Sequence, residues 1–189
     1  MAYKVYVDQG HNPRDYNTGA EGNGYFEQDI TYEVGRILYR LLSQNPNFEP
    51  RLSRPTPDTV LGNDNNSSVT ERVRQANAWG ADIFVSLHTN ASVNPSANGA
   101  EMLIYSIGST EAYRLGEDIL ENLTRTTGIR SRGIVERPGL YVLRRTRMPA
   151  VLVEMGFITN RSDAELMANS PELFARGVYL GILEYYGLT

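Results

Sequence analysis

The chain has 189 residues, of which 41% are apolar and 21% charged, and this length and composition suit a globular protein with one sizeable core. Its formal charge of −4 gives no reason to expect a nucleic-acid partner, and no apolar run approaches the ~20 residues of a membrane span. Because the sequence has no cysteine, disulfides and thiolate ligands are excluded, and a bound metal must be held by nitrogen and oxygen atoms.

In the first half of the chain, strand patterns alternate with helix patterns. A β-rich run predicts a strand over 3–7. After a polar loop, apolar residues at helical spacing predict a helix of about five turns over 27–42. Residues 51–53 suit a short strand, and a capping box opens the helix predicted for 68–80. The apolar run 82–87 predicts the next strand.

The second half continues this alternation. Its predicted elements are a strand over 99–106, a helix over 115–128, strands over 141–143 and 150–154, and helices over 162–168 and from Ser170-Pro171-Glu172 onward. No linker, internal repeat or low-complexity tail interrupts the pattern. Strands that alternate with helices predict an α/β fold. We therefore expect a single three-layer domain over 1–189, with a central, mixed but mostly parallel sheet of about six strands and helices on both faces.

Four side chains stand at the ends of these elements. His11 follows the first strand across a tight turn at Gly10, and His88 ends the apolar run of a later strand. Glu27 opens the first helix, and Glu154 closes a buried strand. The carboxyl ends of strands in an α/β sheet are where chemistry tends to sit, so these residues form a candidate hydrolytic metal site.

The ligand chemistry of zinc narrows the assignment. Zinc in a hydrolytic site takes three protein ligands and keeps one position open for water. The chain has two histidines, so the third ligand should be an acid, and Glu27 is best placed because the first turn of a helix favours a carboxylate. Taken singly, each residue has a plainer interpretation: a hydrogen-bonded structural histidine, or an acid that stabilises a helix N-terminus. Their joint placement at the ends of elements favours the metal site.

Six blocks of the sequence carry a resemblance to a known family. They are Asp8-Gln9-Gly10-His11, residues 18–24, Glu27-Gln28-Asp29-Ile30, Arg72 with residues 76–91, Gly99-Ala100-Glu101 with Arg132-Gly133, and residues 148–160. In this order and spacing they resemble the zinc-dependent N-acetylmuramoyl-L-alanine amidases of the amidase-3 type, which occur in autolysins, sporulation lysins and phage endolysins. The resemblance covers essentially the whole chain.

The resemblance implies a role for each candidate residue. His11, Glu27 and His88 would bind one zinc ion, and Glu154 would be the essential catalytic acid. The chain departs from the family pattern at Gln9, where proline is usual, and at Asn12-Pro13, which replaces a glycine pair. Neither change removes a ligand, but both are expected to alter the loop beside the metal. The sequence assigns no substrate-binding residue.

By the same resemblance, the substrate is peptidoglycan and the bond cut joins the lactyl group of N-acetylmuramic acid to the L-alanine of the stem peptide. Zinc would activate water and polarise the carbonyl, while Glu154 moves a proton from water to the leaving amine. Two alternatives stay open: a zinc peptidase that cuts elsewhere in the stem peptide, and a non-catalytic wall-binding module on the same fold. Retention of all four residues argues against the second.

Three further features have more than one interpretation. Asn90 suits a ligand-orienting or substrate-binding residue and a turn residue equally well. Six arginines lie within 130–147 with Glu136 as the one acid; they could attract wall carboxylates or phosphates, but solvated side chains are the plainer interpretation. No signal peptide is seen, so we expect a protein made in the cytoplasm that acts on the wall after release or lysis, or part of a longer wall-targeted protein. The oligomeric state is not predicted.

Overall fold

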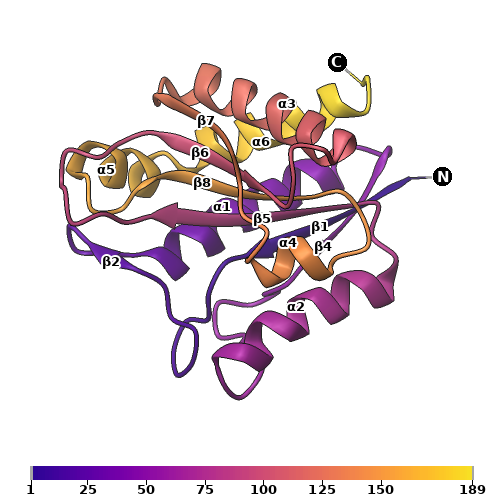
Figure 1. Cartoon of the computed structure of the whole chain (residues 1–189), viewed down its shortest axis with the longest axis horizontal. Coiled ribbons are helices and arrows are strands. Elements are labelled where there is room, and N and C mark those ends of the chain that lie inside the picture. The colour runs from indigo at the N-terminus through magenta and orange to yellow at the C-terminus, as the bar shows by residue number, and fades with distance from the viewer. Residues whose placement is uncertain (1, 189) are drawn as a thin grey trace.

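A six-stranded sheet forms the middle layer of the computed structural model, which describes residues 2–188 (Figure 1). The strand order is β4-β1-β5-β8-β6-β7. The strands are β1 (Tyr3–Gln9), β4 (Phe48–Leu52), β5 (Ile83–Asn90), β6 (Ala100–Ile104), β7 (Ser131–Glu136) and β8 (Ala150–Phe157). β4, β1, β5 and β8 are parallel, β6 runs antiparallel to β8, and β7 runs parallel to β6. The predicted mixed, mostly parallel sheet is confirmed.

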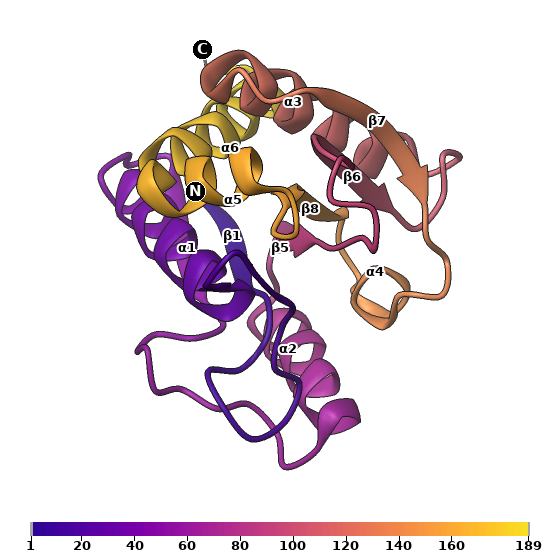
Figure 2. The same ribbon diagram turned by 90° about the vertical axis from the view of Figure 1, so that its left-hand side faces the viewer.

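Helices cover both faces of this sheet, as predicted. They are α1 (Glu27–Ser43), α2 (Asn65–Trp79), α3 (Thr110–Thr127), α4 (Tyr141–Arg145), α5 (Arg161–Asn169) and α6 (Pro171–Tyr185). α1, α3, α5 and α6 lie on one face, and α2 and α4 lie on the other (Figure 2). Along β1, Val5 and Val7 belong to the first core and Tyr6 to the second, because successive side chains of a strand point to opposite faces. The stretch 5–7 of β1, which is covered on both sides, is therefore apolar at every position.

The start of α2 differs from the prediction. Its N-cap is Asp64, whose carboxylate accepts a hydrogen bond of 2.7 Å from the backbone N–H of Ser67, while the Ser67 hydroxyl accepts one from Asp64 N–H. The capping box thus lies one turn earlier than the predicted one at 68–71, and Ser68 is buried inside the helix. Gly80 ends α2 as predicted, with a left-handed φ of 68°.

Two other segments were assigned wrongly or missed. Residues 141–143, predicted as a strand, lie in α4, where Val142 and Leu143 are buried against the sheet; a three-residue apolar run does not distinguish the two structures. β7 was not predicted, because this half-exposed edge strand lacks apolar periodicity, and the two-residue strands β2 (Glu21–Gly22) and β3 (Tyr25–Phe26) were also missed. None of the helices within residues 2–188 is long and apolar enough to cross a membrane.

Candidate metal and catalytic site

The ends of three neighbouring strands bring the predicted residues to one edge of the sheet. β1 and β5 run in parallel register up to the end of β1, so His11, two residues beyond β1, lies beside His88, with 4.8 Å between ring centroids. His88 of β5 is in register with Glu154 of β8. Glu27 reaches the two imidazoles from the first position of α1. The four predicted residues therefore converge.

The turn after β1 tolerates little change. A Cβ atom on Gly10 would lie 2.5 Å from the carbonyl oxygen of Leu87 and 2.6 Å from the imidazole of His88, so glycine is required there. His11 has a φ of 68°. This left-handed conformation is uncommon for a residue with a side chain and costs about 1–3 kcal/mol. Contacts with the rest of the protein must hold the backbone in this conformation.

Glu27 is the centre of the cluster. Its Oε1 atom lies 3.2 Å from His11 Nε2 and 3.0 Å from His88 Nδ1, and one ligand atom from each of the three residues lies within 4.8 Å of the others. Backbone N–H groups also donate to this carboxylate, Thr89 to Oε1 and Ala20 to Oε2. Burial alone would raise the pKa of Glu27, but the two imidazoles hold it well below its usual range.

The hydrogen bonds of His11 indicate what this cluster can hold. Its Nδ1 atom lies 3.1 Å from the carbonyl oxygen of Asn17, which can only accept, so the proton of the neutral ring is assigned to Nδ1. The lone pair of Nε2 then faces Oε1 of Glu27, and two facing acceptors repel each other unless a proton or a metal ion lies between them. Two imidazole nitrogens and one carboxylate oxygen are also a donor set that zinc favours. The residues present fit a zinc ion.

Glu154 lies close to this cluster but outside the ligand set. Its Oε2 atom is buried and has no hydrogen-bond partner within residues 2–188. Burial, followed by the negative charges of Glu27 and Glu101, raises the pKa of Glu154 to about 8, against a smaller opposing effect of Arg137. The two carboxyl groups therefore differ: Glu27 stays ionised and can bind a cation, whereas Glu154 can exchange a proton near neutral pH.

Glu101 is a neighbour whose role the sequence analysis missed. It is in register with Glu154 across the antiparallel β6–β8 pair, and its carboxylate lies 3.5 Å from the guanidinium of Arg132. Glu101 and Arg132 both belong to the blocks of the family resemblance. Only the antiparallel pairing of β6 with β8, however, places Glu101 beside Glu154. All six arginines of residues 130–147 are exposed, which agrees with solvated side chains. Asn90 accepts a hydrogen bond from Ala91 N–H, which favours the turn interpretation.

A cavity of about 430 Å³ opens beside the two histidines, between α2 and α4. Its lining includes both imidazoles, Val69 and Thr70 of α2, and Tyr141 of α4. Most of the exposed lining is apolar. Because the cavity adjoins the imidazoles of His11 and His88, a substrate bound there would lie within reach of them.

The two departures from the family pattern do not line this cavity. Gln9 and Asn12 are fully buried. The Gln9 carboxamide donates to Tyr32 O and accepts from Arg54 N–H, while Asn12 donates to and accepts from the backbone of Leu61. Both side chains thus attach the segment after β4 to the core, and neither lines the cavity.

Comparisons with known proteins identify the family of this chain. A family model described as N-acetylmuramoyl-L-alanine amidase matches residues 5–184. The chain is 36% identical to the N-acetylmuramoyl-L-alanine amidase CwlM of Bacillus licheniformis, in an alignment that covers 98% of this chain and 70% of CwlM. It is 34% identical to LytC of Bacillus subtilis, over 96% of this chain but only 35% of LytC. It is also 32% identical to the endolysin of Bacillus phage SPP1, over the whole chain and 68% of the endolysin.

Solved structures show the same relationship. The N-acetylmuramoyl-L-alanine amidase from Clostridium difficile 630 matches with a TM-score of 0.88 and 29% identity, over 98% of this chain and 97% of that one. The catalytic domain of CwlV from Bacillus (Paenibacillus) polymyxa var. colistinus matches with a TM-score of 0.85 and 29% identity, over 99% of both chains. The resemblance read from the sequence is confirmed: the chain belongs to the N-acetylmuramoyl-L-alanine amidase family and is an enzyme that acts as an amidase on peptidoglycan.

Proposed function

We propose that this amidase is zinc-dependent, that His11, Glu27 and His88 hold one zinc ion, and that Glu154 is the catalytic acid and base. The observation that carries the proposal is the 3.2 Å approach of His11 Nε2 to Glu27 Oε1, two acceptors that need a cation between them when the ring is neutral. The scissile bond is the amide between the lactyl group of N-acetylmuramic acid and L-alanine. A zinc ion in this position supplies Lewis acidity for a water molecule and for the lactyl carbonyl.

The protein's own groups account for the proton transfers. Glu154 accepts a proton as the water oxygen bonds to the lactyl carbonyl carbon. It then donates that proton to the alanine nitrogen as the carbon–nitrogen bond breaks, leaving a lactyl carboxylic acid and a free amine. Because the charge of Glu27 helps to raise the pKa of Glu154, ligation of Glu27 to a cation would bring that pKa down towards neutrality. Proton transfer is most efficient when the pKa lies near the working pH.

Product analysis on purified peptidoglycan tests this proposal. The metal is removed with a chelator and zinc is then restored, while new amino termini and reducing sugar ends are counted. Zinc-dependent release of L-alanine amino termini without new reducing ends supports the proposal. New amino termini at another residue would identify a peptidase that cuts elsewhere in the stem peptide. Wall binding without any release would identify a non-catalytic module, and full activity of the metal-free protein would contradict zinc dependence.

We also propose that residues 1–189 act as one catalytic domain in cell-wall lysis or remodelling. Two relatives support this, because the chain matches only part of each: 68% of the length of the phage SPP1 endolysin and 35% of the length of LytC. The protein would be made in the cytoplasm and reach the wall after release or lysis, or it would be part of a longer wall-targeted protein. Detection of the protein in wall fractions before and after lysis of the producing cells distinguishes these two routes.

A further inference from the structure

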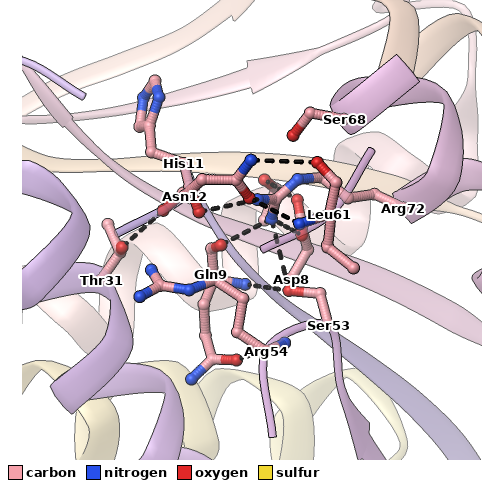
Figure 3. Close-up of polar contacts among 12 residues, drawn as sticks. Asp8, Gln9, His11, Asn12, Thr31, Ser53, Arg54, Leu61, Ser68 and Arg72 are labelled. Carbon is pink, nitrogen blue, oxygen red and sulfur yellow. Dashed lines mark hydrogen bonds and ion pairs between the residues drawn. The ribbon is translucent and has the colours of Figure 1, made fainter. Parts of the chain in front are cut away.

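A buried ion pair lies beneath the turn that carries His11 (Figure 3). Arg72 projects from α2 and is 2% exposed, and Asp8 of β1 is 1% exposed. The Arg72 Nη1 atom donates to Asp8 Oδ1 at 2.6 Å, and the second carboxylate oxygen accepts a hydrogen bond of 2.7 Å from the Ser86 hydroxyl. Both charges are thus paired inside the protein, as buried charges must be.

The same guanidinium also binds the backbone on either side of Gly10. Its Nη1 atom donates to the carbonyl oxygen of Gln9 at 2.6 Å, and its Nη2 atom donates to the carbonyl oxygen of His11 at 2.7 Å. The carbonyl between them, that of Gly10, accepts a hydrogen bond of 2.8 Å from the hydroxyl of Thr31 in α1. Three consecutive carbonyl groups are therefore each held by a side chain from a helix.

This arrangement explains how the backbone of His11 keeps its left-handed φ of 68°. A planar guanidinium with several donors in fixed directions can hold two carbonyl oxygens and a carboxylate at once, which a single ammonium group cannot reproduce. The direction of the His11 ring follows from this backbone, because Nδ1 must reach Asn17 O while Nε2 faces Glu27.

We propose that Arg72 is a positioning residue for His11: it fixes the turn so that Nε2 of His11 points at Glu27 and His88. The inference rests on the proposed function, since it assigns Arg72 to the set of residues that orients a zinc ligand. Partners behind a metal ligand typically contribute about 10–100-fold to metal affinity. Arg72 lies in the lining of the cavity but is only 2% exposed, and its described hydrogen bonds go to Asp8, Ser53 and the turn at residues 9–12, so we assign its effect to the backbone of His11.

Arg54 offers a matched control. It is also an arginine that is 1% exposed, and its guanidinium also donates to two carbonyl oxygens, those of Gln28 and Pro57. It has no hydrogen bond to residues 10–12 among the described contacts. Loss of Arg54 therefore removes a buried cation of the same kind without releasing the His11 turn.

The first test compares Arg72→Ala, Arg72→Lys and Arg54→Ala for zinc affinity by chelator competition. The absorption spectrum of the Co²⁺-loaded proteins reports the ligand geometry. We expect zinc binding at least about tenfold weaker and an altered Co²⁺ spectrum for Arg72→Ala, with a smaller loss for Arg72→Lys. Arg54→Ala should keep both properties even where its melting temperature falls. Wild-type affinity and spectrum in a folded Arg72→Ala protein would overturn the proposal.

The cavity supplies a second test, because Arg72 lies in its lining beside His11. Truncation to alanine opens a space that a small planar cation can enter, so millimolar guanidinium should restore zinc affinity to Arg72→Ala and leave Arg54→Ala unchanged. Urea has a similar planar shape but no charge, so the same concentration of urea should not restore zinc affinity. If Arg72→Ala binds zinc weakly and guanidinium does not restore its zinc affinity, the loss of affinity comes from general misfolding and the positioning role is contradicted.

A metal-free readout separates this inference from the proposed function. Nitrogen NMR of the His11 ring reports whether Nδ1 carries a proton that is hydrogen-bonded to the carbonyl oxygen of Asn17, whatever Nε2 carries. We expect this hydrogen bond in the wild type and in Arg54→Ala, and its loss in Arg72→Lys, which is the more conservative variant if Arg72→Ala does not fold. If the wild type binds no zinc but this hydrogen bond is seen, the positioning role stands and the zinc proposal fails. An unchanged Nδ1–H hydrogen bond in both Arg72 variants would overturn the positioning role.

Discussion

Glu27, which is buried, and Glu154, which is half-buried with its Oε2 atom inside the protein, lie at the same edge of the sheet, yet their surroundings drive their pKa values in opposite directions. Two imidazoles lie against the carboxylate of Glu27 and two backbone N–H groups donate to it; against the effect of burial, these surroundings hold its pKa below the usual range. Glu154 has one oxygen without a hydrogen-bond partner among residues 2–188, and burial, followed by two nearby carboxylates, raises its pKa to about 8. The donors around a carboxyl group, and not its residue type, decide whether it serves as a ligand or as an acid.

The largest expected effect comes from Glu154→Gln, which keeps the shape of the side chain and removes its ability to take up a proton. We expect amidase turnover to fall by roughly 10²–10⁴-fold while zinc affinity stays within about threefold of the wild type. Turnover on purified peptidoglycan and chelator competition measure the two quantities. Glu165→Gln, on the exposed face of α5, is the control and should be fully active. An active Glu154→Gln enzyme would refute the assigned role.

Glu27→Gln should give the opposite pattern, with the metal affinity as the primary loss. The carboxamide cannot offer an anionic oxygen to a cation, so zinc affinity should fall by about a hundredfold or more, beyond the effect of an outer partner. Turnover should recover in part when zinc is raised, whereas Glu154→Gln should not respond to zinc. Equal zinc affinity in Glu27→Gln and the wild type would remove Glu27 from the ligand set.

The raised pKa of Glu154 makes a prediction about the stability of the metal-free protein. The ordinary value of 4.5 applies to the unfolded chain, and the folded value is about 8. Below pH 4.5 the group is protonated in both states, and as the pH rises towards 8 the unfolded state alone releases the proton. Wild-type stability relative to Glu154→Gln should therefore decline across this window, by roughly a few kcal/mol. Urea unfolding of both proteins at several pH values measures this difference; parallel stability curves would contradict it.

Much of the site could be predicted because it depends on the ends of strongly patterned elements. Consecutive parallel strands must present their carboxyl ends at one edge, so the positions of His11 and His88 after apolar runs already implied that they meet. Glu27 was equally visible as the first residue of a long amphipathic helix. The sequence pattern therefore predicted that these three residues lie together, as they do in the structure, while their role as metal ligands stays a prediction.

The pKa of Glu154 could not be predicted in the same way. It depends on burial and on Glu101, which reaches Glu154 only because β6 is antiparallel to β8. The support of His11 by Arg72 joins residues that are 61 positions apart, and no local periodicity encodes such a contact. Short apolar runs also did not distinguish strands from helices, since residues 141–143 were predicted as a strand but form part of α4.

Glu101→Gln is expected to have the smallest effect, and it separates the contribution of Glu101 to the raised pKa of Glu154 from those of burial and Glu27. Removing this negative charge should lower the pKa of Glu154 and lessen the loss of stability at pH 8 by about 1 kcal/mol or less. Arg132→Gln is the control, because it breaks the 3.5 Å ion pair but leaves Glu101 charged, so the loss should not lessen. The same urea series measures both variants. A pH profile unchanged by Glu101→Gln would mean that burial and Glu27 alone keep Glu154 protonated, so that of the two neighbouring carboxylates only Glu27 affects the pKa of Glu154.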